Sequence, residues 1–381
     1  MKATWLNGTL RERISRWWER EQAQPSAAVD IFKELGEAGR ILVVPNDRVG
    51  GVVIGAPVCR AVRQRYPRAR ICLLVDEAKA AIAGQLPYAD EVIGAPLERP
   101  VGSRELTAAR HRLQENNFDL ALCLGADCSY RLAWLCGGSG ARMRLGFSRP
   151  GMKPFNLEVV PRTGSTYEGE QYLGLLALIG LEGLSETRWA VEAERAAQAR
   201  SRYLEEESSR NAIGVDLSGG EDRGLSRRQL DELVGRVIER GARPVLFFTP
   251  AEQRQLNFLH KSHGNRVLPY LQDDLAGSAA LLANCRALVA CNTELLHLAG
   301  AMQVPVVGIF SEDPRRWVHP HSGWVKTIQS ADLRSVGIPQ IARLLEEALA
   351  GAGAEFPGYR PLRHEQRRSA WKKWWSPTAR S

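Results

Sequence analysis

The stretch that decides the fold is Cys285-Arg-Ala-Leu-Val-Ala-Cys-Asn-Thr-Glu-Leu-Leu-His-Leu-Ala-Gly-Ala-Met-Gln-Val-Pro-Val-Val-Gly-Ile-Phe310-Ser. Residues 287–291 and 304–310 are short, nearly continuous apolar runs, separated by a polar break and a short helical pattern. Two buried strands joined by a helix are typical of a parallel βαβ unit. The polar residues 292–294 therefore fall at the carboxyl end of a strand and at the start of a helix, where an anionic ligand is favoured.

The same alternation of strands and helices runs along most of the chain. It predicts an α/β protein with doubly wound parallel sheets. A length of 381 residues is too great for one ordinary core, so we expect two Rossmann-like domains. The expected division is an N-terminal extension (1–38), a first domain (39–180), a second domain (181–340) and a C-terminal helix and tail (341–381).

Composition narrows the classes of partner. The chain is 44% hydrophobic and 25% charged, as in soluble globular proteins, and its net charge of +8 favours anionic partners such as nucleotides or acidic glycolipids. No nucleic-acid recognition motif accompanies this charge, so nucleic acid is not expected. The seven cysteines are odd in number, lack a C-x-x-C pair and lie mostly in apolar runs. We therefore expect reduced thiols in a cytoplasmic protein and no metal site.

The termini bear on localisation. No apolar run reaches the roughly 20 residues of a membrane span, and residues 1–10 lack a signal-peptide core, which predicts a cytoplasmic protein. Residues 360–375 mix Trp with Lys and Arg, which favours contact with the inner face of the cytoplasmic membrane over a disordered tail. An amphipathic pattern at residues 10–20 suits a membrane surface and the protein's own surface equally well.

Several motifs carry a resemblance to a known family. One is Val49-Gly-Gly-Val-Val-Ile-Gly-Ala-Pro57, which follows the first core strand and opens a helix. Another is Asn292-Thr-Glu-Leu-Leu-His-Leu-Ala-Gly-Ala301, followed by Val304-Pro-Val-Val307. Over about residues 40 to 330 the chain resembles the glycosyltransferase family of the ADP-heptose:lipopolysaccharide heptosyltransferases, which is glycosyltransferase family 9.

The resemblance implies a GT-B fold, in which two Rossmann-like domains face each other across a cleft. It further implies transfer of a heptose-like sugar from an ADP-activated donor to a lipopolysaccharide-type or other glycolipid or glycan acceptor, without a metal. The second domain would bind the donor through Ser218, Gly219, Arg223, Asn292, Thr293, Glu294 and His297. The first domain would meet the acceptor through the loop that contains Arg48, Gly50 and Gly51.

One departure concerns the general base. The family carries an Asp at the position of Gly51, and a glycine accepts no proton. Asp47 in the same loop is the nearest carboxylate that could substitute, although capping of loop backbone N–H groups is its commoner role. His297 likewise has two alternative roles, which are contact with the donor diphosphate and support of the strand-to-helix turn.

Two further departures lie in the donor segment. Asn292 and Glu294 stand where the family has Asp and Gly, and Glu294 places a negative charge where a phosphate would rest. A catalytically inactive GT-B protein, retained for binding or assembly, is therefore an alternative to a sugar transferase.

Overall fold

A computed structural model describes residues 35–86, 88–149, 153–162, 167–181, 189, 191–204, 211–219, 224–319 and 324–351. The chain divides into two compact units, Met1–Thr187 and Arg188–Ser381, against a boundary expected near residue 180. Within the described residues each unit holds one six-stranded sheet, and every strand pairing is parallel. The predicted α/β class with doubly wound parallel sheets is confirmed.

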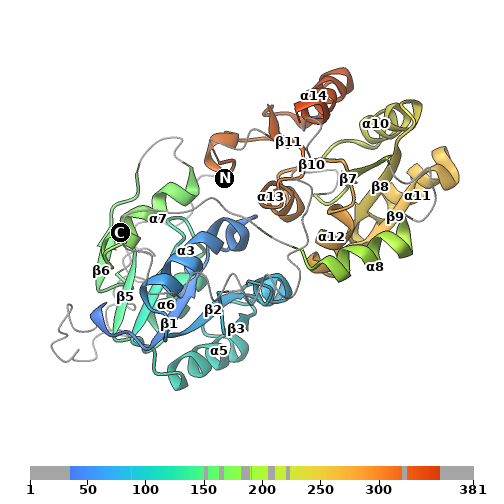
Figure 1. Ribbon diagram of the computed structural model, residues 1–381. Helices are drawn as coiled ribbons and strands as arrows, with labels where there is room; N and C mark the ends of the chain where they lie inside the picture. Colours follow the sequence, from blue (N-terminus) through green and yellow to red (C-terminus); the bar gives the residue numbers. More distant parts are fainter. Residues whose placement is uncertain are drawn as a thin grey trace, which may run out of the picture. The chain divides into compact units, whose positions relative to one another are not determined.

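The sheet of the first unit has the strand order β3-β2-β1-β4-β5-β6 (Figure 1). Its strands are β1 (Arg40–Val44), β2 (Arg70–Asp76), β3 (Glu91–Ala95), β4 (Leu120–Cys123), β5 (Met143–Phe147) and β6 (Leu157–Val159). Its helices are α3 (Gly51–Arg65), α4 (Ala80–Ala83), α5 (Arg104–Glu115), α6 (Tyr130–Gly137) and α7 (Glu168–Ala177).

Both faces of this sheet are buried, which explains the continuous apolar runs of its central strands. Leu42 of β1 and Cys72 of β2 belong to one core cluster with Leu113 of α5 and Leu135 of α6. Ile41 is next to Leu42 in β1 and therefore points to the opposite face of the sheet. Helices α3 and α7 pack against each other.

The sheet of the second unit repeats this order as β12-β11-β10-β7-β8-β9. Its strands are β7 (Ala212–Asp216), β8 (Arg243–Phe248), β9 (Leu268–Leu271), β10 (Ala287–Cys291), β11 (Val306–Phe310) and β12 (Val325–Gln329). Its helices are α8 (Ala193–Tyr203), α10 (Arg227–Glu239), α11 (Gln253–His263), α12 (Leu275–Leu282), α13 (Glu294–Ala301) and α14 (Ile338–Gly351).

One face of the second sheet carries α10, α11 and α14. Leu233 of α10, Leu259 of α11 and Ile341 of α14 share a core cluster with Val215 of β7 and Val289 of β10. Helix α12 contacts both α8 and α13, separately from this cluster. Helix α10 begins directly after Ser226, because Ser226 and Gln229 form a complete capping box.

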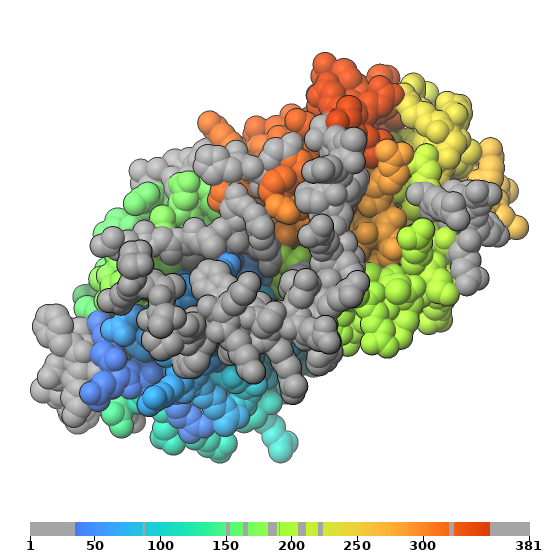
Figure 2. Space-filling view, in the orientation of Figure 1, coloured from blue at the N-terminus to red at the C-terminus, as the bar shows by residue number. Residues whose placement is uncertain are grey.

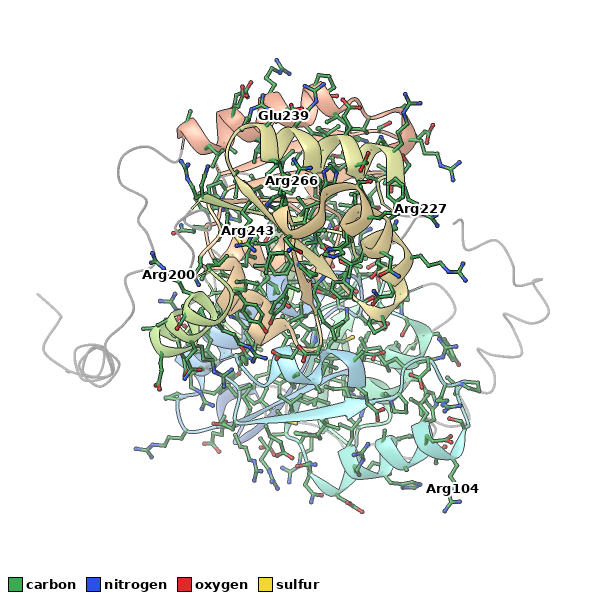
Figure 3. All side chains as sticks on the ribbon, turned by 90° about the vertical axis from the view of Figure 1, so that its right-hand side faces the viewer. Arg104, Arg200, Arg227, Glu239, Arg243 and Arg266 are labelled. Carbon is green, nitrogen blue, oxygen red and sulfur yellow. The ribbon has the colours of Figure 1, made fainter. Side chains whose placement is uncertain are left out.

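The charged side chains lie at the margins of these layers. Figure 2 shows α14 and α10 side by side at the surface of the second unit, where Arg240 Nε donates to Glu346 Oε1 at 2.9 Å. Figure 3 shows Arg200, Arg227 and Arg266 on different elements of the same unit, and all three are exposed. These arginines do not form one basic face, unlike the stripe that typically binds nucleic acid.

Candidate functional site

Each sheet reverses its strand order once, and doubly wound folds bind ligands at the carboxyl ends of the strands on either side of that reversal. In the first sheet the reversal lies between β1 and β4. In the second sheet it lies between β7 and β10. The residues that follow these four strands are therefore the candidate site residues of the two units.

The loop between β1 and α3 is closed tightly around Gly51. Gly50, with φ of 74°, precedes the helix, and the N–H of Gly51 donates to Arg48 O at 3.0 Å. A β-carbon built on Gly51 would lie 1.9 Å from the carbonyl oxygen of Asn46. The backbone itself occupies the space, so this loop leaves no room for the aspartate that the family resemblance places there.

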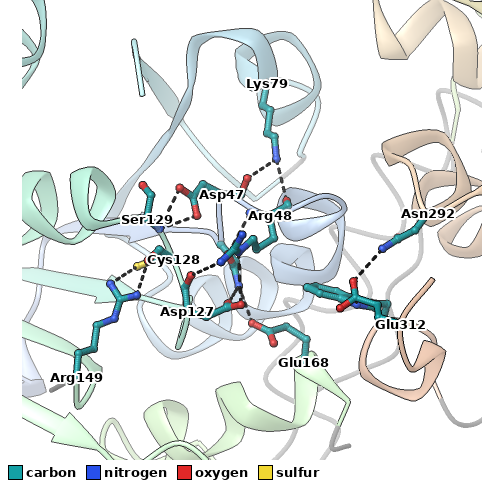
Figure 4. Close-up of polar contacts among 12 residues, drawn as sticks. Asp47, Arg48, Lys79, Asp127, Cys128, Ser129, Arg149, Glu168, Asn292 and Glu312 are labelled. Atoms are coloured by element: carbon teal, nitrogen blue, oxygen red, sulfur yellow. Dashed lines mark hydrogen bonds and ion pairs between the residues drawn. The ribbon is translucent and has the colours of Figure 1, made fainter. Parts of the chain in front are cut away.

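Two side chains fix this loop: Asn46 within the loop itself and Lys79 in the segment that follows β2. The backbone N–H of Arg48 donates to Asn46 Oδ1 at 3.1 Å, a local turn of the kind that Asn favours. Lys79, at the start of α4, donates through Nζ to the carbonyl oxygens of Asp47 at 2.9 Å and Arg48 at 2.8 Å (Figure 4).

Asp47 points from this loop to the start of α6. Its two carboxylate oxygens lie 3.0 and 3.1 Å from the backbone nitrogen of Ser129, which donates to them, and Ser129 Oγ in turn caps the N–H of Leu132 (Figure 4). Asp47 therefore caps a backbone N–H group, which is one of the two roles that its position in the sequence suggests, the other being that of a general base. The negative charge at a helix start adds a favourable interaction with the helix dipole.

A polar cluster joins the ends of β1 and β4. Asn46 is buried, and its Nδ2 donates to Asp127 Oδ1 at 3.0 Å and to Glu168 Oε1 at 2.8 Å. Arg48 lies beside it, with Nε 3.4 Å from Asp127 Oδ2 and Nη2 donating to the carbonyl oxygen of Asp127 at 3.3 Å. Figure 4 shows these side chains converging beside the β1–α3 loop.

Sequence reasoning missed Asp127 and Glu168. Asp127 carried a usable signal, because it is a polar residue in the loop after a buried strand, as Asn292 is in the second domain. Glu168 carried none beyond its place in the first turn of a helix, since its partner Asn46 lies 122 positions away in the sequence.

In the second unit the corresponding centre is Asp216, the last residue of β7. Its Oδ1 accepts from Ser218 Oγ at 2.6 Å, Ser218 N at 3.0 Å and Gln272 Nε2 at 3.1 Å, and its Oδ2 accepts from Thr293 Oγ1 at 2.6 Å. Burial raises the pKa of the Asp216 carboxyl above its ordinary value, although the hydrogen bonds from Ser218, Thr293 and Gln272 act in the opposite direction. Nothing in the sequence distinguishes Asp216 from the rest of its strand.

Thr293 brings the expected helix start into this centre. It is the N-cap of α13, and its Oγ1 accepts from the N–H of Leu296 at 3.4 Å while it donates to Asp216. Ser218 and Gly219 follow β7 at the same edge of the sheet, and Gly219 has φ of 115°. The structure thus brings Ser218 and Thr293 together through Asp216.

Asn292 and His297 form a second polar link at the end of β10. His297 Nε2 lies 2.8 Å from Asn292 Oδ1, and the amide nitrogen of Asn292 lies 3.5 Å from Glu312 Oε1 (Figure 4). Trp317 Nε1 also donates to Glu312 Oε1, at 2.9 Å. His297 therefore supports the strand-to-helix turn, while Glu294 lies half-buried in the first turn of α13.

Several expected features fall outside the described residues, namely Arg223, residues 1–34 and the basic aromatic segment 360–375. None of the helices within the described ranges is long and apolar enough to cross a bilayer. Across the same part of the chain, no three His, Cys, Asp or Glu side chains gather in a way that would hold a metal ion.

Comparison with known proteins decides the family. The model of "Glycosyltransferase family 9 (heptosyltransferase)" matches residues 106–334, which is more than half of the chain. The chain belongs to glycosyltransferase family 9. The match takes in strands of both sheets and begins after the β1–α3 loop.

Individual members of the family agree with this assignment. Lipopolysaccharide heptosyltransferase 2 of Escherichia coli (strain K12) is 24% identical over 339 residues, covering 76% of this chain and 88% of that protein. The structure of a glycosyl transferase family 9 protein from Veillonella parvula has a TM-score of 0.70 at 16% identity, covering 83% of this chain and 98% of its own. E. coli ADP-heptose lps heptosyltransferase II has a TM-score of 0.68 at 20% identity, with coverage of 83% and 100%. The expected GT-B fold is confirmed.

The crowding at Gly51 leads to a first prediction. Gly51→Asp restores the family residue, but we expect it to lower the free energy of unfolding by about 1–3 kcal/mol or more, because the new β-carbon meets backbone. Gly36→Asp is the matched control, since a β-carbon at Gly36 meets nothing within 4 Å. Urea denaturation of both variants measures the difference, and a Gly51→Asp variant as stable as Gly36→Asp would contradict the tight loop.

The buried carboxyl of Asp216 leads to a second prediction. Its folded-state pKa is raised, so the folded protein holds a proton that the unfolded chain releases, and stability from this group falls as pH rises above the ordinary value of 3.8. Asp216→Asn removes this titration. We expect the free energy of unfolding of the wild type to fall relative to that of Asp216→Asn as the pH rises above about 4. Urea denaturation at several pH values measures it, and a constant difference would contradict the raised pKa.

Proposed function

We propose that this chain transfers a heptose-like sugar from an ADP-activated donor to a lipopolysaccharide-type acceptor. The observation that supports this most is the family match, which takes in both sheets and the donor-side segments after β7 and β10. In such a transfer an acceptor hydroxyl oxygen forms a bond to the anomeric carbon, the bond from that carbon to the diphosphate oxygen breaks, and ADP leaves with the negative charge.

The donor diphosphate would rest on the second unit, against Ser218, Gly219 and the first turn of α13. The N–H groups of a helix's first turn and its dipole favour a negative charge. The hydroxyl groups of Ser218 and Thr293 both donate to Asp216, so the backbone N–H groups would supply most of the contacts to phosphate. Arg223 would add a charge-assisted contact, and Asn292 replaces a charged residue with a neutral amide.

The acceptor would meet the first unit at the loop of Arg48, Gly50 and Gly51. Arg48 is more than half exposed, with a side-chain exposure of 56%, and so remains accessible to an anionic glycan. The basic aromatic segment 360–375 would bring the protein to the inner face of the cytoplasmic membrane, where a glycolipid acceptor would be presented.

A second candidate function is binding without catalysis. The closed loop at Gly51 and the carboxylate of Glu294 in the first turn of α13 favour it. A negatively charged side chain at that position opposes a bound phosphate. The two candidates differ in one observable, which is release of ADP from a sugar donor.

Nucleotide binding to the full chain tests the proposal. We expect calorimetry to show tighter binding of ADP than of UDP or GDP. Arg223→Ala should weaken ADP binding about 10- to 150-fold, the loss typical of one charged hydrogen bond. Arg266→Ala is the control, because Arg266 is exposed and lies in another loop. Absence of binding by all three nucleotides would contradict a nucleotide-sugar transferase.

Turnover separates the two candidates. With ADP-heptose as donor and lipopolysaccharide truncated in its heptose region as acceptor, we expect release of ADP together with a mass increase of one heptose. Binding of ADP without release from the donor would instead support the inactive alternative.

A further inference from the structure

The carboxylate nearest the closed loop does not come from the loop itself. Asp127 follows β4 and lies at the point where the strand order reverses between β1 and β4. This is the position at which doubly wound sheets bind ligands. Its side chain is 35% exposed, and its Oδ1 accepts from Asn46 Nδ2.

The other acidic groups beside this edge are engaged differently. Asp47 directs both oxygens to the N–H of Ser129 at the start of α6. Glu168 has an exposure of only 2% and accepts from Asn46. Position 51 has no side chain and no room for one. Among these positions, Asp127 alone combines a carboxylate, exposure and a place at the strand ends.

We propose that Asp127 is the general base of the transfer, an inference that rests on the proposed function. As the acceptor oxygen bonds to the anomeric carbon and the bond to the leaving diphosphate breaks, the hydroxyl proton passes to the Asp127 carboxylate. The base has thus moved from the loop after β1 to the loop after β4.

Asn46 and Glu168 are positioning residues for Asp127. Asn46 gives one amide hydrogen to Asp127 and the other to Glu168, while its oxygen accepts from the N–H of Arg48. Turning the amide over would set its oxygen against two carboxylates, so its orientation is fixed. A held carboxylate loses less entropy when it meets the reacting hydroxyl.

Arg48 lies beside the Asp127 carboxylate. Its Nε lies 3.4 Å from Asp127 Oδ2, and both side chains are partly exposed, so the ion pair contributes little to stability. The guanidinium instead attracts an anionic acceptor to the atoms next to the base.

The test compares single carboxylate-to-amide variants of the full chain, with ADP-heptose and heptose-truncated lipopolysaccharide as substrates. We expect Asp127→Asn to lower kcat about 10²- to 10⁴-fold, the usual contribution of a general base, with unchanged affinity for ADP. Glu98→Gln is the matched control, since the side chain of Glu98 in the same unit is 65% exposed. We expect this control to keep the wild-type kcat.

A role through folding alone is excluded by four further variants. Sodium formate added to Asp127→Ala should restore part of kcat, because a small carboxylate can enter the vacated space. Glu168→Ala should lower kcat, whereas Glu168→Gln should restore it, because the glutamine oxygen still accepts from Asn46. Asp47→Asn should lower the thermal midpoint through the start of α6 while the folded protein keeps its kcat.

The outcomes separate this inference from the proposed function. A wild type that neither binds ADP nor releases it from ADP-heptose overturns the proposed function. A wild type that turns over while Asp127→Asn keeps its kcat overturns the assignment of Asp127 and leaves the function standing. If Asp127→Asn does not fold, absence of formate rescue in Asp127→Ala overturns the assignment, as does loss of kcat confined to Asp47→Asn.

Discussion

A β-carbon on residue 51 would lie 1.9 Å from the carbonyl oxygen of Asn46, and this crowding constrains the β1–α3 loop of the first unit. A backbone atom cannot turn aside as a flexible side chain can. The β1–α3 loop is also tied by Lys79 and by the Asn46 turn, so three separate contacts hold it closed. Any chemistry at this edge must therefore use side chains other than one at residue 51.

In both units a side-chain hydrogen bond links the two chain segments at the point where the strand order reverses. In the first, Asn46 at the end of β1 donates to Asp127 in the loop after β4. In the second, Thr293 in the loop after β10 donates to Asp216 at the end of β7. Each bond links the ends of the two strands between which the order reverses, the position at which doubly wound sheets bind ligands. Each one therefore fixes the geometry of a candidate site edge.

The sequence was sufficient for the fold because apolar periodicity is a local property. The runs at residues 287–291 and 304–310 predicted β10 and β11 and the polar start of α13, and the family resemblance extended this to both sheets. The side-chain partners were not predictable in the same way. Asp127 lies 81 positions from Asn46, and Thr293 lies 77 from Asp216, so their pairing follows from strand order rather than from spacing.

Asp216 places a carboxylate at the edge of the second sheet where the donor diphosphate is proposed to bind. Asp216 is buried beneath Ser218 and Thr293, and both hydroxyl hydrogens point to it. Its charge is spread over four donor hydrogen bonds, while the raised pKa records that burial still opposes ionisation. A phosphate arriving at the start of α13 would favour protonation of Asp216 further, because like charges repel in a partly desolvated site. If the proposed donor binds there, its binding would be coupled to proton uptake through Asp216, the carboxylate that bridges two strand ends.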